Sequence, residues 1–238
     1  MLSTVDRDRR SHALEGGLIT GQAQRPGMTD VPIPGGRDVR GTLEASDDPG
    51  AVVVACPPHP QHGGSRTDQR LVAVSTALQE AGIACLRFDY GAWDDGYGER
   101  EDVRNAVRWA RETDRWDSDL PVGVFGYSFG ASQALLAAGG LEDGAVDAVS
   151  VLAPTARLGD ELDALEAYER LSVPVQVCYG ERDTTVEWEP FVERARNRGD
   201  DVTSFPADHF FLGKRTEIAS TVSDFFERTL LESDALEG

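Results

Sequence analysis

The sequence predicts an α/β protein, in which helices cover both faces of a mostly parallel, doubly wound sheet. From Met28 onward, short apolar runs alternate with longer amphipathic runs, and strands separated by helices of about 10–15 residues are typical of βαβ units. Several apolar runs are continuous rather than alternating, as strands buried on both faces are. The chain has 238 residues. At roughly 150 residues per domain, this length favours one domain, which we place at residues 28–238.

The expected elements follow in order along the chain. Residues 31–34 and 37–44 flank the pair Gly35-Gly36, which predicts a β-hairpin of two short strands. Residues 51–56, AVVVAC, are an unbroken apolar run and predict a central strand. Residues 99–112 predict a helix, because apolar residues recur there at steps of three and four. By the same criteria we expect helices at residues 67–80, 131–138, 186–198 and 217–231, and strands at residues 83–88, 122–125, 145–152, 173–179 and 202–205.

Two segments lie outside this alternation. Residues 1–27 mix Arg, Asp, Gly, Ser and Gln without a helical or strand period, which predicts a disordered tail. The alternative is that translation naturally starts at Met28, so that residues 1–27 do not belong to the natural protein. Residues 153–170 interrupt the expected sheet but are too short for a separate domain, so we expect an open site without a large lid.

The charge balance excludes several classes of partner. The chain has 42 acidic and 23 basic residues and a net charge of −19, so it should repel nucleic acids and anionic membrane surfaces. All the basic residues except Lys214 are arginine. This composition predicts adaptation to a high-salt cytoplasm, as in a halophile, because at 1 M salt the screening length of about 3 Å removes most self-repulsion.

The rest of the composition bears on compartment and cofactors. The sequence contains no run of about 18 apolar residues, so no transmembrane helix is expected. Residues 1–17 lack the apolar core of a signal peptide, which favours a cytoplasmic protein. Cys56, Cys85 and Cys178 are widely spaced and form no C-x-x-C pair, which predicts buried free thiols rather than disulfides or a zinc site. We expect no metal ion and no cofactor.

Residues 126–130 read Gly-Tyr-Ser-Phe-Gly, a G-x-S-x-G pattern between a predicted strand and a predicted helix. A sharp turn there raises the Ser128 hydroxyl above the sheet, beside the N-terminus of the next helix, whose dipole favours a developing anion. Glycine is required two positions before and after Ser128, because side chains there would collide. We therefore predict that Ser128 is a nucleophile; an idle serine in a glycine-rich turn is the alternative.

A serine nucleophile needs a base, which after such a turn lies later in the chain. The chain has four histidines, and His209 is the one that follows Ser128. It lies between the last predicted strand and the last predicted helix. We therefore expect His209 to be the general base.

The base in turn needs a carboxylate to orient it. Asp183 comes directly after the strand predicted at 173–179, so it should project from the carboxyl end of that strand. Glu181 and Asp208 are rivals, but adjacent loop residues such as Asp208 and His209 rarely present their side chains to each other. We therefore favour Asp183.

An acyl-transfer site also needs two donors for the oxyanion. The backbone N–H of Phe129, which follows the nucleophile, is one of them. The second should come from the loop after residues 51–56, where the prolines at positions 57, 58 and 60 have no N–H to donate. His59 and Gln61 remain, and we favour Gln61. The histidines of this loop have no Cys or acid at ligand spacing, so a metal site is not expected there.

Aromatic residues occur close in sequence to the candidate site. Tyr90, Trp93 and Tyr97 follow the strand predicted at 83–88, and Tyr127 follows the strand predicted at 122–125. They could line a substrate pocket for an acyl or aryl group, or they could be ordinary packing. Both interpretations stay open from the sequence.

Together these motifs resemble those of the α/β-hydrolase superfamily, and most of all its small, lidless, dienelactone-hydrolase-like branch of prokaryotic proteins. The resemblance covers roughly residues 40–230. The matching segments are residues 58–65, 86–90, 96–99, 126–130, 180–183 and 208–211. The resemblance implies a minimal α/β-hydrolase fold, with the catalytic positions in the last three segments.

The chain departs from that branch at three places. Pro57 stands where the first histidine of the branch's HPHP segment is expected, and residues 91–95 are shorter than the usual turn. Dienelactone hydrolases proper use a cysteine nucleophile, whereas Ser128 stands there in this chain. The resemblance therefore does not carry over that particular reaction.

These observations predict a serine hydrolase that cleaves a small ester or thioester through an acyl-enzyme. A non-catalytic binding or scaffold protein with the same fold is the alternative, although it would not need both a base and an acid. A peptidase of the prolyl-oligopeptidase type is disfavoured, because it would be expected to have a large additional domain. The oligomeric state is not predicted.

Overall fold

The computed structural model describes residues 27–116 and 120–232. The strands of its main sheet are β1 (Met28–Ile33), β2 (Val39–Glu44), β3 (Ala51–Cys56), β4 (Ile83–Asp89), β5 (Val122–Tyr127), β6 (Ala148–Leu152), β9 (Val175–Gly180) and β10 (Asp201–Phe205). The helices are α1 (Gln69–Glu80), α2 (Tyr97–Glu112), α3 (Phe129–Ala138), α4 (Ala164–Glu169), α5 (Glu189–Arg198) and α6 (Arg215–Phe226), which continues into a π-helical turn (Glu227–Leu231). The predicted tail, residues 1–27, lies outside the described residues except for Gly27.

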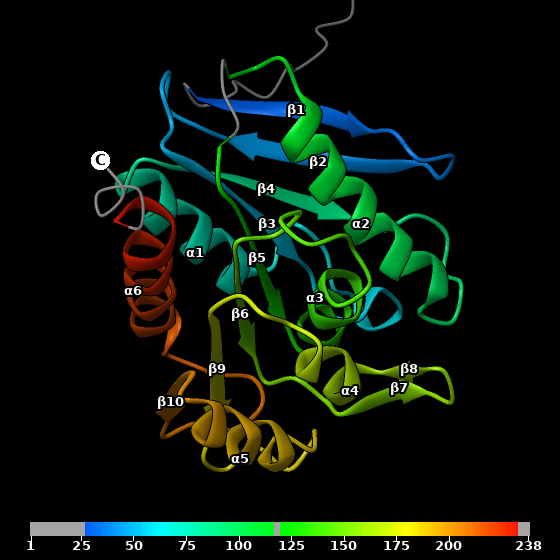
Figure 1. The fold of residues 1–238 in the computed structure, drawn as a ribbon, viewed down its shortest axis with the longest axis vertical. Coiled ribbons are helices and arrows are strands. Elements are labelled where there is room, and N and C mark those ends of the chain that lie inside the picture. The colour runs from blue at the N-terminus through cyan, green and yellow to red at the C-terminus, as the bar shows by residue number, and fades with distance from the viewer. Residues whose placement is uncertain (1–26, 117–119, 233–238) are drawn as a thin grey trace, which may run out of the picture.

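The eight strands form one sheet in the order β1-β2-β4-β3-β5-β6-β9-β10 (Figure 1). From β4 to β10 all neighbours in this order are parallel, whereas β2 is antiparallel to both β1 and β4. The β1–β2 pair is the predicted hairpin, although β1 begins and ends earlier in the chain than expected. The predicted fold class, a mostly parallel sheet with helices, is therefore confirmed.

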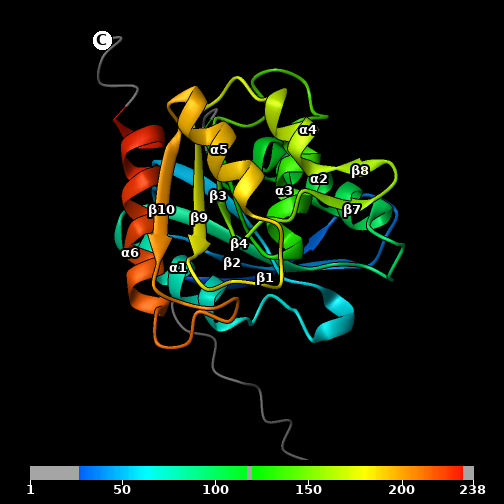
Figure 2. The same cartoon turned by 90° about the horizontal axis from the view of Figure 1, so that it is seen from below.

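Helices cover both faces of the sheet. Helices α1 and α6 lie side by side on one face, and α2, α3, α4 and α5 lie on the other (Figures 1 and 2). Within β3, Val52 and Val54 face the second group of helices, whereas Val53 and Ala55 face α1 and α6. Both sides of β3 are thus removed from water, which is why its sequence is an unbroken apolar run.

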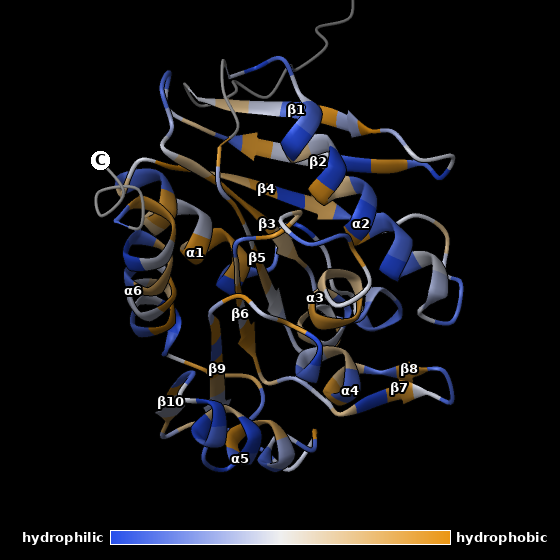
Figure 3. Ribbon diagram, in the orientation of Figure 1, coloured by the Kyte–Doolittle hydropathy of each residue, from blue (hydrophilic) through white to orange (hydrophobic). Residues whose placement is uncertain are grey.

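The hydropathy of the ribbon follows the same layers. The central strands and the inner sides of the helices are hydrophobic, and the outer sides of α2 and α5 are hydrophilic (Figure 3). In α2, Val103, Ala106, Val107 and Ala110 are buried, which confirms the face predicted from the period. Burial of these side chains is the main driving force that holds α2 on the sheet.

Residues 153–170 form small elements of their own. They contain a two-stranded ribbon, β7 (Arg157–Gly159) with β8 (Leu162–Asp163), followed directly by α4, which packs on α3. Leu162 and Tyr168 are fully buried and anchor this segment to the core. Strands of two and three residues are too short to leave a periodic signal in the sequence, so the ribbon was not predicted.

Two helices begin later than the hydrophobic pattern suggested, and local chemistry explains one of them. Helix α1 begins at Gln69 because the Asp68 side chain caps it by accepting a hydrogen bond from the Arg70 amide at 2.9 Å. Helix α5 begins at Glu189, with Pro190 in its first turn, and leaves Val186 in the preceding loop. Both shifts matter for the site, since Asp68, Arg70 and Val186 all line its cavity.

The three cysteines are buried and free, as predicted. Burial raises the pKa of the Cys85 thiol to about 12 and raises the pKa values of Cys56 and Cys178 further. Over the described ranges, no helix is long and apolar enough to cross a membrane. The same residues contain no group of three His, Cys, Asp or Glu side chains placed to hold a metal ion.

Candidate active site

Three segments with reactive side chains meet at the carboxyl edge of the sheet. Ser128 directly follows β5, Asp183 lies three residues after β9, and His209 lies four residues after β10. Because the carboxyl ends of parallel strands share one edge, this topology brings the three segments together.

Ser128 occupies a strained turn between β5 and α3. Its φ is 57° and its ψ is −120°, a conformation that costs energy for any residue but glycine. A Cβ on Gly126 would lie 2.2 Å from the Gly130 carbonyl oxygen, and a Cβ on Gly130 would lie 2.3 Å from the Cys56 carbonyl oxygen. Both clashes are with backbone atoms, so glycine is required at these positions for the turn to close.

The three side chains form a continuous chain of hydrogen bonds. Ser128 Oγ lies 2.9 Å from His209 Nε2, and His209 Nδ1 lies 2.7 Å from Asp183 Oδ2. The other carboxylate oxygen of Asp183 accepts a hydrogen bond from the Thr185 amide at 2.8 Å. The Asp183 side chain is fully buried and that of His209 is 10% exposed. With Nδ1–H donated to the carboxylate, Nε2 is free to accept the serine proton.

The rival acids have other partners. Glu181 is exposed and accepts a hydrogen bond from the Ser204 hydroxyl at 2.9 Å. Asp208 is also exposed, and its carboxylate accepts from the Phe210 amide at 3.0 Å. Neither carboxylate reaches the imidazole, so the structure brings Asp183, and not its rivals, to His209.

The predicted first oxyanion donor lies at the start of α3. Phe129 is the first residue of that helix, so its N–H has no partner within the helix, and it follows Ser128 directly. Its ring is enclosed by His59, Tyr90 and Trp93, with centroids 4.8, 5.7 and 5.8 Å away. These rings fix the residue that carries the donor.

The favoured candidate for the second donor, Gln61, has an amide that is already bonded. Pro60 begins a single 3-10 turn (Pro60–His62), and within it the Gln61 amide donates to His59 Nδ1 at 3.3 Å. Gln61 is exposed and does not line the cavity, so the favoured candidate is wrong on geometry. The His59 amide precedes the turn and has no hydrogen-bond partner among residues 27–116 and 120–232. Of the two candidate amides, that of His59 is therefore the one without a hydrogen-bond partner.

Comparison with known protein families identifies the family of the chain. A model of the X-Pro dipeptidyl-peptidase (S15) family matches residues 88–235, which is more than half of the chain. The chain belongs to the S15 family. No curated protein matches it in a sequence search.

Solved structures similar to this S15-family chain have low sequence identity. A lidless α/β serine hydrolase from Xanthomonas campestris is 21% identical with a TM-score of 0.70, over 88% of this chain and 98% of that one. A dienelactone hydrolase from Anabaena variabilis is 23% identical with a TM-score of 0.74, over 87% and 100%. An esterase from Pyrococcus furiosus is 19% identical with a TM-score of 0.71, over 85% and 93%. These likenesses confirm the α/β-hydrolase fold that the sequence motifs predicted.

A cavity of about 450 Å³ opens over Ser128 in the S15-family chain. Of the aromatic residues singled out from the sequence, Tyr127 lines this cavity. Tyr90 and Trp93 do not; the Tyr90 hydroxyl donates to the Pro57 carbonyl at 3.3 Å, and the Trp93 ring packs on His59. Both rings also pack against Phe129, so they lie among the side chains around the cavity and not on its lining.

Sequence reasoning missed several lining residues of the cavity. Leu158 and Thr155 come from the segment between β6 and α4, and Val186 and Phe210 come from the loops that carry the acid and the base. Of the lining residues that were missed, only Asp68 has a recognisable sequence pattern, because an Asp before an amphipathic run predicts the N-cap of a helix. The walls are a mixture of apolar, polar and charged side chains, and the cavity is wide enough for a small substrate.

Several charged or titratable groups line the cavity. Arg70 and Asp68 form an ion pair on its wall, and His59 is kept neutral because burial and the nearby His62 lower its pKa. Burial raises the pKa of Tyr127 to about 12, so its hydroxyl keeps its proton and donates to the His209 carbonyl at 2.8 Å.

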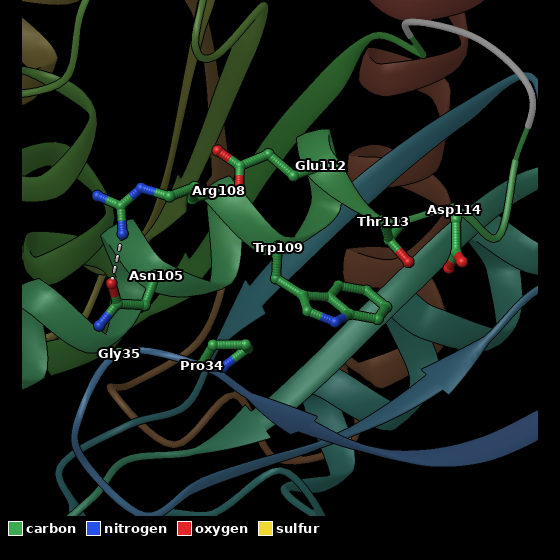
Figure 4. Close-up of a pocket in the computed structure, with 8 residues that line it drawn as sticks. All are labelled: Pro34, Gly35, Asn105, Arg108, Trp109, Glu112, Thr113 and Asp114. Atoms are coloured by element: carbon green, nitrogen blue, oxygen red, sulfur yellow. Dashed lines mark hydrogen bonds between the residues drawn. The ribbon is translucent and has the colours of Figure 1, made fainter.

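A second hollow of the S15-family chain, about 510 Å³, lies between α2 and the turn after β1 (Figure 4). Trp109 and Pro34 line it, with Arg108 donating to the Asn105 side chain at 2.7 Å. None of its lining residues lines the cavity over Ser128. It brings no nucleophile and base together, so we assign no chemistry to it.

Proposed function

We propose that this chain is a serine hydrolase that cleaves a small carboxylic ester or thioester. Ser128 Oγ attacks the substrate carbonyl carbon while His209 Nε2 takes the hydroxyl proton, and a tetrahedral intermediate forms. The buried Asp183 carboxylate stabilises the imidazolium that results. The intermediate then expels its alcohol or thiol, which takes the proton back from His209, and leaves an acyl group on Ser128.

The negative charge on the carbonyl oxygen needs donors that are in place before reaction. The Phe129 and His59 amides supply them, and the ring cluster around Phe129 holds both residues still. Preorganised donors of this kind stabilise the transition state without having to reorient. Water activated by His209 then attacks the acyl-enzyme, releases the acid and restores Ser128.

A single observation carries the proposal. The unbroken hydrogen-bond sequence from Ser128 through His209 to the buried Asp183, at 2.9 and 2.7 Å, has no evident structural purpose. A turn held at positive φ and a buried carboxylate both cost stability, so a scaffold without activity would gain nothing from them.

A peptidase is the second candidate, because the matching family is described by X-Pro dipeptidyl-peptidase activity. Release of a dipeptide requires a carboxylate to bind the substrate's N-terminal ammonium. Among the described residues, the one carboxylate that lines the cavity is Asp68, and it is already paired with Arg70. This pairing favours an uncharged acyl group over a peptide N-terminus.

Turnover of two sets of chromogenic substrates tests the proposal. We expect hydrolysis of p-nitrophenyl esters from acetate to octanoate, with little release from alanyl-prolyl-p-nitroanilide, and loss of turnover in Ser128→Ala. The matched control is Ser132→Ala, a serine on the same helix that bonds the Thr155 carbonyl instead of His209. Faster cleavage of the anilide than of the esters would indicate a peptidase instead. Absence of all turnover would support a non-catalytic binding protein.

A further inference from the structure

The loop that carries His209 is held in place by groups outside itself. Phe211 has a φ of 50°, which is disfavoured for a residue with a side chain, so the loop would relax if left alone. Its internal bonds are short-range, from Phe210 to the Asp208 carboxylate and from Phe211 to the Asp208 carbonyl. The carbonyls of His209 and Phe210 point to other elements instead.

Tyr127 binds the first of these carbonyls. Its hydroxyl donates to the His209 carbonyl at 2.8 Å, and its ring lies 5.7 Å from the imidazole. Because Tyr127 is the last residue of β5 and precedes Ser128 directly, it connects the backbone of the base to that of the nucleophile.

Arg70 binds the second carbonyl. One terminal nitrogen of its guanidinium donates to the Phe210 carbonyl at 2.8 Å, across 140 positions of sequence. Its Nε and its other terminal nitrogen donate to the two oxygens of Asp68, which also caps α1. The guanidinium carbon lies 4.3 Å from the centroid of the Tyr127 ring. The Arg70 fork is thereby fixed by a carboxylate on one side and an aromatic face on another.

We propose that Arg70 is a positioning residue for His209, acting with Tyr127 to hold two consecutive carbonyls of the histidine loop. The proposal rests on the proposed function, since it assigns Arg70 a part in that reaction without contact to the reacting atoms. Helix α1 lies beside α6 in both views (Figures 1 and 2), so its N-terminus is a fixed support for the loop that leads into α6.

A substrate-binding role for Arg70 is the competing explanation, because Arg70 also lines the cavity. The two roles differ in kinetics. A positioning residue affects kcat, because misplacement of a catalytic group by about 1 Å can cost on the order of 100-fold in rate. A substrate-binding residue affects KM. The bidentate pair with Asp68 leaves Arg70 little charge to offer a substrate, which favours positioning.

The test compares Arg70→Met, Arg70→Lys and Tyr127→Phe with the control Arg215→Met. Arg215 begins α6 and bonds Gln69, but it makes no bond to residues 209 or 210. With p-nitrophenyl acetate we expect Arg70→Met to lower kcat by about 10- to 100-fold with KM unchanged. Arg70→Lys should recover part of this loss, because lysine keeps a cation over Tyr127 but not the fork. Arg215→Met should match the wild type.

A proton NMR measurement separates this proposal from the proposed function. The imidazole N–H that is bonded to Asp183 should give a far-downfield resonance in the wild type and in Arg215→Met, and it should broaden or vanish in Arg70→Met. This readout needs no turnover, so it tests positioning even where the ester assay fails. If Arg70→Met does not fold, Tyr127→Phe carries both measurements with the same expectations.

Three results would overturn the proposal. An unchanged kcat in Arg70→Met would show that the loop holds itself. A raised KM with unchanged kcat would make Arg70 a substrate-binding group. A lower kcat with an unchanged downfield resonance would mean that the rate loss does not arise at His209.

Discussion

Among the described residues, three histidines line the same cavity, and the structure holds two of them, His209 and His59, in different ways. His209 is fixed from outside its loop, by Asp183, Tyr127 and Arg70. His59 is fixed within its own loop, because its Nδ1 accepts the Gln61 amide, and it is packed by neighbouring rings. One imidazole therefore has a nitrogen free for the serine and a carboxylate behind it, whereas the other has used Nδ1 to close a turn. We infer that the partner of Nδ1, and not the presence of the ring at the site, decides which histidine acts as the proposed base.

The strongest test of the different roles of His209 and His59 makes the same substitution in both. We expect His209→Gln to lower kcat/KM for p-nitrophenyl acetate by about 10⁴- to 10⁶-fold, because His209 Nε2 is the group bonded to Ser128 Oγ and would take its proton. His59→Gln should lose less than about tenfold, since its proposed contribution comes from the backbone. Comparable losses in the two variants would contradict the different roles assigned to them.

The carboxylate behind His209 should come next in effect. In Asp183→Asn the amide donates to Nδ1, which leaves the proton on Nε2 and removes the acceptor for Ser128, so kcat should fall by about 10⁴-fold. Asp208→Asn and Glu181→Gln are the matched controls and should retain wild-type rates, because neither carboxylate contacts the imidazole. A large loss in Asp208→Asn with a small one in Asp183→Asn would reverse the assignment.

The backbone role of His59 can be tested separately from its ring. Its φ of −55° fits proline, so His59→Pro removes the N–H with little change of backbone, whereas His59→Ala keeps the N–H. Both variants lose the ring equally. We expect kcat in His59→Pro to be lower than in His59→Ala by about 10²- to 10³-fold, the usual effect of losing one oxyanion donor. Equal rates would assign the second donor elsewhere.

Salt should have the smallest effect on the site and a clear one on the surface. The net charge of −19 predicts that the thermal midpoint rises by several degrees between dilute buffer and about 1 M KCl, as screening weakens self-repulsion. Activity should rise with the folded fraction, while kcat per folded molecule changes little, because the His209–Asp183 pair is buried. A protein that is most stable in dilute buffer would contradict the surface argument. Calorimetry over a KCl series measures it.

The sequence alone predicts features that depend on an apolar run or on the order of residues along the chain. AVVVAC has no polar position, so β3 could be predicted to the residue. Chain order left His209 as the one candidate base, and strand-end placement pointed to Asp183. The choice of His209 and Asp183 depends only on which ends of the strands lie at the same edge of the sheet. The alternation of strands and helices already predicts parallel strands and therefore that edge.

Other features of the site could not be predicted, because they depend on the backbone torsion angles of individual loops. The choice between His59 and Gln61 depended on a 3-10 turn that the His59 ring itself caps. The parts played by Arg70 and Tyr127 depended on contacts to carbonyls 140 and 82 positions away. Backbone carbonyls have no sequence signature, so their partners could not be read from residue types.

The most direct test of the central claim is labelling by a fluorophosphonate, which reacts covalently with an activated serine. We predict one adduct per folded chain in the intact-mass spectrum, mapped to the peptide that contains Ser128, with much slower labelling in His209→Gln and none in Ser128→Ala. The matched serine variant, Ser132→Ala, should label as the wild type does. A folded wild type that takes up no label, or that takes it up at another residue, would contradict the account.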